Sequence, residues 1–334
     1  MSLSTWTSRG LLAGLALVVL AAIPVRPAHA IEPKYLPADT EAVITVNLKA
    51  ILDSDLAKAH KELFAKAKDK LKDKLDNSPA KDYFTKAGFD VFKDLHSITI
   101  ASTGGKDTDK IFLVIEGDFD VDKILDVAQN AGAEVKVGKV GNVNTLEISA
   151  GEDQKTIHAG ILNEHVIVAA GTRALLTEGI ARSNSARASV KPALKTLLNS
   201  TKATQALSMI MTAGAISNAI NDSPVPLPDK INDQVTALNG LSINFTVAKN
   251  ISFLMSADVK DNDKASDMSK MLNFGLLAMR GMIGNKAAQD EKAQIVLDIA
   301  NTLRVAQAGS NVTLRGEVSR ENFDRLIEMM PKKE

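Results

Sequence analysis

Carboxylates at alternating positions are the residues in this chain best suited to hold a metal ion. Asp118, Asp120 and Asp122 have the spacing of the first ligands of a calcium-binding loop. Such a loop also needs Gly at its sixth position and Glu at its twelfth, where this chain has Lys123 and Gln129. Carboxylates at a helix start also accept hydrogen bonds from free backbone N–H groups. We therefore interpret the three aspartates as a helix start, with calcium binding as the alternative.

Methionine is the second residue type that suggests chemistry, because it is confined to one half of the chain. Apart from Met1, all the methionines lie after residue 200, and four fall on one predicted helix: Met268, Met271, Met279 and Met282. Thioethers bind Cu(I), line adaptable apolar grooves, or simply fill a core. Core packing is the favoured interpretation. The functional hypothesis is an apolar groove bordered by these four side chains that takes a lipid or a partner's helix, with Gly281 and Gly284 allowing the helix to yield.

Residues for covalent catalysis do not form a recognisable pattern. Outside the N-terminal segment the histidines are scattered, and no Gly-x-Ser-x-Gly or His-x-x-x-His motif is present: His60, His96, His158 and His165. Ser78 and Lys81 match Ser-x-x-Lys, but a proline lies between them and the companion motifs of such hydrolases are missing. We expect a non-catalytic binding or structural protein without a cofactor. The alternative is an extracytoplasmic hydrolase whose site is assembled only in the fold.

The first thirty residues predict export. Arg9 precedes an apolar run over 11–23, and residues 28–30 are Ala-His-Ala, the small-residue pattern of a signal peptidase site. The run is shorter than the roughly 20 residues that a membrane-spanning helix needs. We therefore expect a signal peptide over 1–30 and a periplasmic or extracellular protein without a transmembrane segment. An uncleaved anchor is the alternative.

Composition excludes several kinds of partner and site. Removing Arg9 and Arg26 with the leader leaves a net charge of −2, which argues against a nucleic-acid partner because phosphate neutralisation drives such binding. The chain has no cysteine, so thiolate metal sites are excluded. Aromatic residues make up 4% of the chain, and its one tryptophan is in the leader. Carbohydrate and single-strand binders usually need aromatic platforms, so both are disfavoured.

The elements that must position any site include a hairpin followed by a helix, and this unit occurs twice. The first copy runs over 96–117 and the second over 241–257, each followed by an aspartate-rich helix start. Apolar residues alternate along both strands of the second hairpin, which is typical of strands with one buried face. Placing Val247 opposite Ile251 puts both apolar sets on one face and leaves a three-residue loop.

A short segment near the start of the mature chain carries a family resemblance. Tyr35-Leu-Pro-Ala-Asp-Thr, leading into a predicted strand over 41–48, resembles the opening of uncharacterised exported bacterial proteins with a duplicated layout. The resemblance implies an exported α+β protein of unknown role and assigns no functional residue.

We therefore predict an α+β protein built from two tandem related units, each an antiparallel sheet with helices packed on one face. The first unit covers 31–183, a bridging segment and helix cover 184–203, and the second unit covers 204–334. The expected ligand is unknown, with a lipid or a protein partner as the candidates.

Overall fold

The structure is a computed structural model, and it describes most of the chain after the expected leader. The described residues are 32–77, 81–103, 108–149, 156–185, 190–221 and 229–329. The predicted signal peptide over 1–30 lies outside them.

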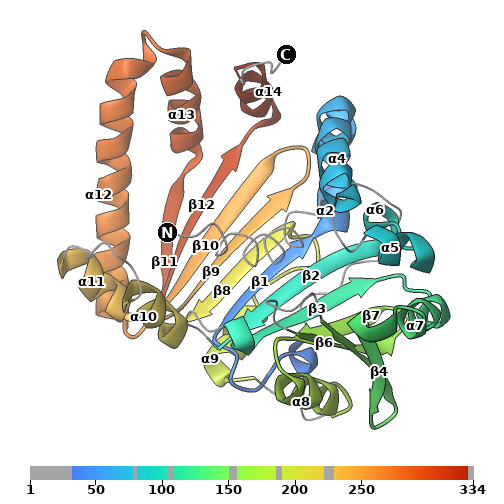
Figure 1. The fold of residues 1–334 in the computed structure, drawn as a ribbon. Helices are drawn as coiled ribbons and strands as arrows, with labels where there is room; N and C mark the ends of the chain where they lie inside the picture. The colour runs from blue at the N-terminus through green and yellow to red at the C-terminus, as the bar shows by residue number, and fades with distance from the viewer. Residues whose placement is uncertain are drawn as a thin grey trace, which may run out of the picture.

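The described strands form one antiparallel sheet of twelve strands. Figure 1 shows this sheet from β11 at one edge to β4 at the other. In chain order the strands are β1 (Ala42–Asn47), β2 (Leu95–Ser102), β3 (Ile111–Gly117), β4 (Val135–Val140), β5 (Val143–Ile148), β6 (Ile157–Asn163), β7 (Val166–Ala170), β8 (Leu207–Thr212), β9 (Leu238–Val247), β10 (Ile251–Val259), β11 (Arg304–Ala308) and β12 (Asn311–Val318). Their order across the sheet is β11-β12-β10-β9-β8-β1-β2-β3-β7-β6-β5-β4.

The helices surround this sheet. They are η2 (Pro33–Tyr35), α2 (Leu48–Leu52), α3 (Asp55–Ala59), α4 (Lys61–Asp76), α5 (Lys81–Ala87), α6 (Val91–Asp94), η3 (Thr108–Lys110), α7 (Val121–Gln129), η4 (Gly132–Glu134), α8 (Arg173–Ser183), α9 (Pro192–Leu198), α10 (Ala213–Asn221), α11 (Asp229–Thr236), α12 (Asn262–Ala287), α13 (Glu291–Thr302) and α14 (Arg320–Glu328). The α+β class predicted from the sequence is confirmed.

The two halves of the chain meet at the centre of the sheet, where β1 pairs with β8. Outward from this pair, the order is β1-β2-β3-β7 in one half and β8-β9-β10-β12 in the other. The predicted pairing of Val247 with Ile251 in the second hairpin is also observed. The common strand order supports a duplicated unit, but duplication and the proposed boundaries remain predictions that superposition of the halves would test.

In the first half of the chain, helices lie on both faces of the sheet, which differs from the one-sided packing predicted for that unit. Val43 and Phe112 point to the face where α8 and α9 pack. Ile98 contributes to a cluster with α2, α4 and α6 on the other face, and Ala169 to a cluster with α7. The reason is that the strands at the centre of the first half are apolar at consecutive positions, as in Val166–Ala170, so both of their faces need cover.

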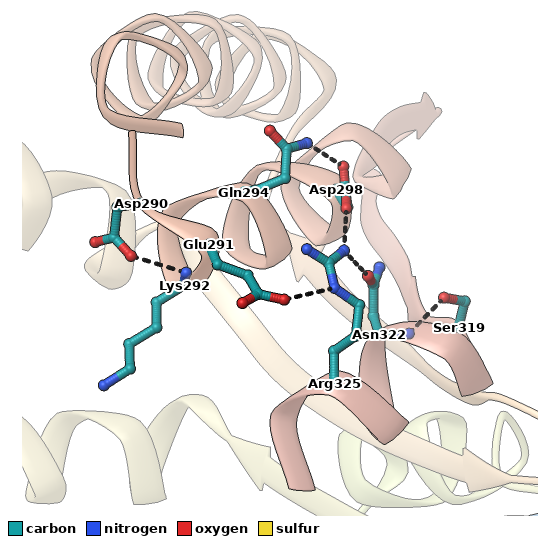
Figure 2. Close-up of polar contacts among 8 residues, drawn as sticks. All are labelled: Asp290, Glu291, Lys292, Gln294, Asp298, Ser319, Asn322 and Arg325. Atoms are coloured by element: carbon teal, nitrogen blue, oxygen red, sulfur yellow. Dashed lines mark hydrogen bonds and ion pairs between the residues drawn. The ribbon is translucent and has the colours of Figure 1, made fainter. Parts of the chain in front are cut away.

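The C-terminal helix α14 connects the two halves through polar contacts. On one side Arg325 lies 3.5 Å from Glu291 and 3.3 Å from Asp298 of α13, as Figure 2 shows. On the other side Asp324 lies 2.8 Å from His60, close enough for an ion pair although the two groups are not aligned for a hydrogen bond. Helix α14 therefore joins the α12–α13 hairpin to the segment between α3 and α4.

Candidate functional site

A row of apolar side chains crosses the sheet on a single face. The strand register places Ile44 opposite both Ile100 and Met209, and Ile243 opposite both Met209 and Met255. The row continues beyond Met255 through two further residues to the edge strand β11: Leu314 and Val305. Because residues that pair across strands share one face, these side chains form one continuous apolar strip.

A second apolar row runs beside the first on the central strands. Leu207 pairs with Phe245, and Phe245 pairs with Phe253. The two phenylalanine rings have centroids 6.1 Å apart and are tilted by 39°, within the usual range for interacting aromatic rings. We call the six residues Ile44, Met209, Ile243, Phe245, Phe253 and Met255 the central apolar face.

The central apolar face is only partly covered by the described helices. Ile44 is 36% exposed, and the other five side chains are half-buried. Ser208 and Ser242, which alternate with these residues and point to the opposite face, are buried. On β9 the usual alternation of apolar-in and polar-out is therefore reversed around Ser242, whereas on β8 the buried face carries Ile210 beside Ser208.

Helices frame the central apolar face at its borders. The tip of the β9–β10 hairpin contacts α3 through the bond that the Leu56 N–H donates to the Ala248 carbonyl oxygen, and α14 through the bond that the Arg320 N–H donates to Asn250. Helix α10 packs against β8 and β9 nearer the other end of these strands, while α12 and α13 pack against β11 and β12. Figure 1 shows α12 and α13 to one side of β8–β10 and α4 to the other. An open apolar surface within such a frame is typical of a binding site.

The four methionines predicted to border a groove do not share one environment. Met268 is buried in a core cluster with Ala265 and Val259, and Met279 is half-buried. Met271 and Met282 are exposed on α12. The two cavities described below lie elsewhere in the fold, so the groove bordered by these residues remains a prediction.

The three aspartates predicted as a helix start or a calcium site also separate. Asp120 caps α7 by accepting a hydrogen bond from the Lys123 N–H, and its carboxylate lies 2.8 Å from the Lys123 ammonium, which lowers the Asp120 pKa. Asp118 contacts two histidines, at 3.2 Å from His96 and 3.2 Å from His165. Asp122 lies in the first turn of α7. Among the described residues no group of three or more His, Asp or Glu has metal-binding geometry.

Asp118 also lines a cavity of about 180 Å³. Its other lining residues come from α5 to α7: Ala87, Gly88, Phe89, Asp94, Asp120, Lys123 and Ile124. Burial raises the pKa of Asp94, and the nearby Asp90 and Asp118 raise it further, while a hydrogen bond from the Asp90 N–H opposes the shift. None of the lining side chains is a hydroxyl or thiol nucleophile. A smaller cavity lies on the opposite face of the sheet beside Thr45 and Thr99.

Burial of His96 gives a testable pH dependence. Burial lowers the pKa of His96 from its usual 6.5, and the contact with Asp118 only partly offsets this. The unfolded chain therefore binds a proton more readily in the window just below pH 6.5, so this group lowers stability as the pH falls through that window. The pKa of Asp94 is raised from 3.8, so its effect on stability occurs at a more acidic pH. Because the folded state binds this proton more readily, Asp94 raises stability as the pH falls.

We expect the variant His96→Gln to lose less stability than the wild type between pH 7 and pH 5. Urea unfolding at both values would measure the difference. As a control, Leu254→Ser, an exposed substitution that removes no titratable group, should leave the wild-type dependence unchanged. An identical pH dependence in His96→Gln and the wild type would contradict the effect assigned to His96.

Sequence reasoning identified the strands of the central apolar face but predicted that their apolar side was buried. Alternation on β9 and β10 shows which residues share a face, and that part is correct. Whether a helix covers the face depends on contacts between distant segments, which periodicity does not report.

Comparisons with known proteins show no family. No family model matches the chain, and no curated protein matches it. Two solved structures are similar in outline, both of the protein TP0453 at 11% identity. Crystal form III covers 92% of this chain and 99% of its own with a TM-score of 0.44, and crystal form IV covers 90% and 97% with a TM-score of 0.46. At these scores the likeness carries no functional conclusion. Within the described part of the chain, no helix is both long and apolar enough to span a membrane.

Proposed function

We propose that this chain is an exported, non-catalytic binding protein that takes the acyl chain of a lipid on its central apolar face. The observation that carries the proposal is the continuous row from Ile44 to Met255, apolar at every position and left partly exposed. A monomeric protein gains stability by covering such a surface, so one left open is typical of a binding surface. Export is the expectation from the leader and supports a role outside the cytoplasm.

The shape and chemistry of the face favour an acyl chain over a compact polar ligand. The row from Ile44 on β1 to Leu314 on β12 crosses five strands, which corresponds to about 19 Å at the usual strand spacing. No residue of the row is charged or carries a hydrogen-bonding side chain. Its methionines are unbranched and polarizable, which lets the surface adapt to a flexible chain.

Removal of apolar surface from β10 tests the proposal. We expect the double variant Phe253→Ser and Met255→Ser to bind palmitic acid at least about tenfold more weakly than the wild type, because burying one large apolar side chain contributes enough free energy for such a change. Binding is measured on the chain from Ile31 onward, by native mass spectrometry and by titration with palmitic acid.

A matched control lies between the two substituted residues. Leu254 is 38% exposed and points to the opposite face of β10, so Leu254→Ser removes apolar surface from the same strand without touching the site. It should bind palmitic acid like the wild type. Equal weakening in the control, or a wild-type protein that binds no fatty acid, would reject the central apolar face as the site.

The hydrolase alternative is favoured by the cavity lined by Asp94 and Asp118. The pKa of Asp94 is raised, and His96 contacts Asp118. A perturbed carboxyl group in a cavity is a common feature of catalytic sites. Turnover of an ester, peptide or phosphate substrate that is lost in Asp94→Asn would replace the binding proposal with this one.

A further inference from the structure

Helix α12 carries an apolar stripe on its outer side that the protein does not cover. Phe274 is 74% exposed, Leu277 and Met282 are each 67% exposed, and Met271 is 41% exposed. Met271, Phe274, Ala278 and Met282 follow one another at spacings of three and four, which places them on one side of a helix, with Leu277 beside them. We call Met271, Phe274, Leu277 and Met282 the α12 stripe.

The stripe is separate from the part of α12 that holds the fold together. Ala265 and Met268 are buried in a core cluster with β10 and β12, and Leu272 packs against it. Arg280 donates to the carbonyl oxygens of Ala300 and Leu303 at the end of α13. Around Gly275, by contrast, no heavy atom lies within 4 Å of where a β-carbon would be. One side of the helix is therefore packed and the other is open.

The charges of α12 are arranged to suit an anionic surface. Between Asp267 and Asp290 the chain has no acidic residue and three basic ones: Lys270, Arg280 and Lys286. Arg280 is held against the end of α13, so the basic groups that can meet a surface are Lys286, which is exposed, and Lys270, which lies 3.4 Å from Asp267 in an exposed ion pair. The acidic residues of the helix are confined to its first turns, where Asp261 caps it. An amphipathic helix with aromatic and aliphatic residues on one side and basic residues beside them is typical of a helix that lies in a membrane interface.

We infer that α12 is a membrane-contact helix, whose stripe inserts shallowly into the surface of an anionic lipid bilayer. A stable dimer is a poorer fit, because it needs roughly 800 Å² from each partner. A phenylalanine offers about 150–250 Å², and the three smaller, partly exposed side chains do not make up the difference. A bilayer needs no complementary shape. The inference stands on different residues from the central apolar face and holds whether or not that face binds an acyl chain.

Flotation with vesicles tests the inference on the chain from Ile31 onward. We expect it to float with vesicles of phosphatidylcholine mixed with phosphatidylglycerol, and more weakly with phosphatidylcholine alone. The double variant Phe274→Ser and Leu277→Ser should partition at least about tenfold less into the mixed vesicles. Lys270→Glu with Lys286→Glu should remove the preference for the anionic lipid and its sensitivity to salt.

Two controls separate this inference from others. Leu254→Ser, an exposed apolar substitution away from α12, should float like the wild type. Phe253→Ser with Met255→Ser should keep vesicle binding even if it loses palmitic acid, so the two sites can fail independently. The inference is overturned if the wild type binds neither vesicle, if the control loses binding as the stripe variant does, or if the stripe variant instead abolishes a concentration-dependent dimer.

Discussion

Replacing Phe112 with alanine is expected to lower the free energy of unfolding by about 3–5 kcal/mol. Phe112 on β3 is fully buried and lies in the core cluster beneath α8 and α9. A β-carbon at Gly179 of α8 would come within 2.3 Å of the phenylalanine ring, so the helix and the ring are in direct contact. Since the surrounding β-strands and helices relax only partly, removal of the ring leaves a cavity as well as losing the transfer free energy.

This loss would be a large share of the total stability of an ordinary protein, which is about 5–15 kcal/mol. Urea unfolding measures it as a lower midpoint with an unchanged slope. Phe274→Ala is the matched control, because Phe274 is an exposed phenylalanine on α12, and its stability should change by no more than about 0.5 kcal/mol. A Phe112→Ala variant that loses less than about 1 kcal/mol would show that α8 closes over the gap.

Much of this fold follows from local patterns in the sequence. The three-residue hairpin loop is set by the requirement that Val247 and Ile251 share a face, and the register confirms it. Aspartates before α7 and α12 cap those helices, because carboxylates accept hydrogen bonds from the first free N–H groups. These features depend on residues within a few positions of one another, which is why periodicity and cap chemistry suffice.

The arrangement of the elements depends on contacts that no local pattern contains. The pairing of Ile44 with Met209 joins segments that are far apart in the chain, and it makes one sheet from the strands of the two units, which the sequence left open. The same pairing builds the central apolar face. Spacing alone predicts that the four methionines lie along one side of α12, but it does not tell that Met268, near the start of the helix, is buried and that Met282, fourteen residues later, is exposed. Helical spacing specifies which residues share a side; packing decides which side is covered.

The cluster around Asp118 shows the same limit. Its histidines, His96 and His165, come from β2 and from the turn before β7, and only the sheet brings them to one carboxylate. No local pattern in the sequence connects these histidines with Asp118, because they lie 22 and 47 positions from it. What places them together is the pairing of β3 with both β2 and β7.

Gly117→Ala is expected to destabilise the protein by about 1–3 kcal/mol through overpacking. A β-carbon at Gly117 would lie 2.4 Å from the carbonyl oxygen of Asp94 and 2.9 Å from the ring of Phe119. The Asp94 carbonyl cannot move away freely, because it accepts a hydrogen bond from the Asp118 N–H at 2.7 Å. Relief of the clash must therefore shift the backbone that carries Asp118, and the NMR resonances of His96 should shift with it.

Gly275→Ala provides the opposite outcome from the same chemical change. Gly275 lies within α12, and a β-carbon there meets no heavy atom within 4 Å. Alanine should raise the stability by about 0.5–1 kcal/mol, because it restricts the unfolded chain and is favoured in a helix interior. Urea unfolding of both variants checks the pair. Changes of the same sign would contradict the close contact at Gly117 or the open surface at Gly275, since only those surroundings distinguish the two substitutions.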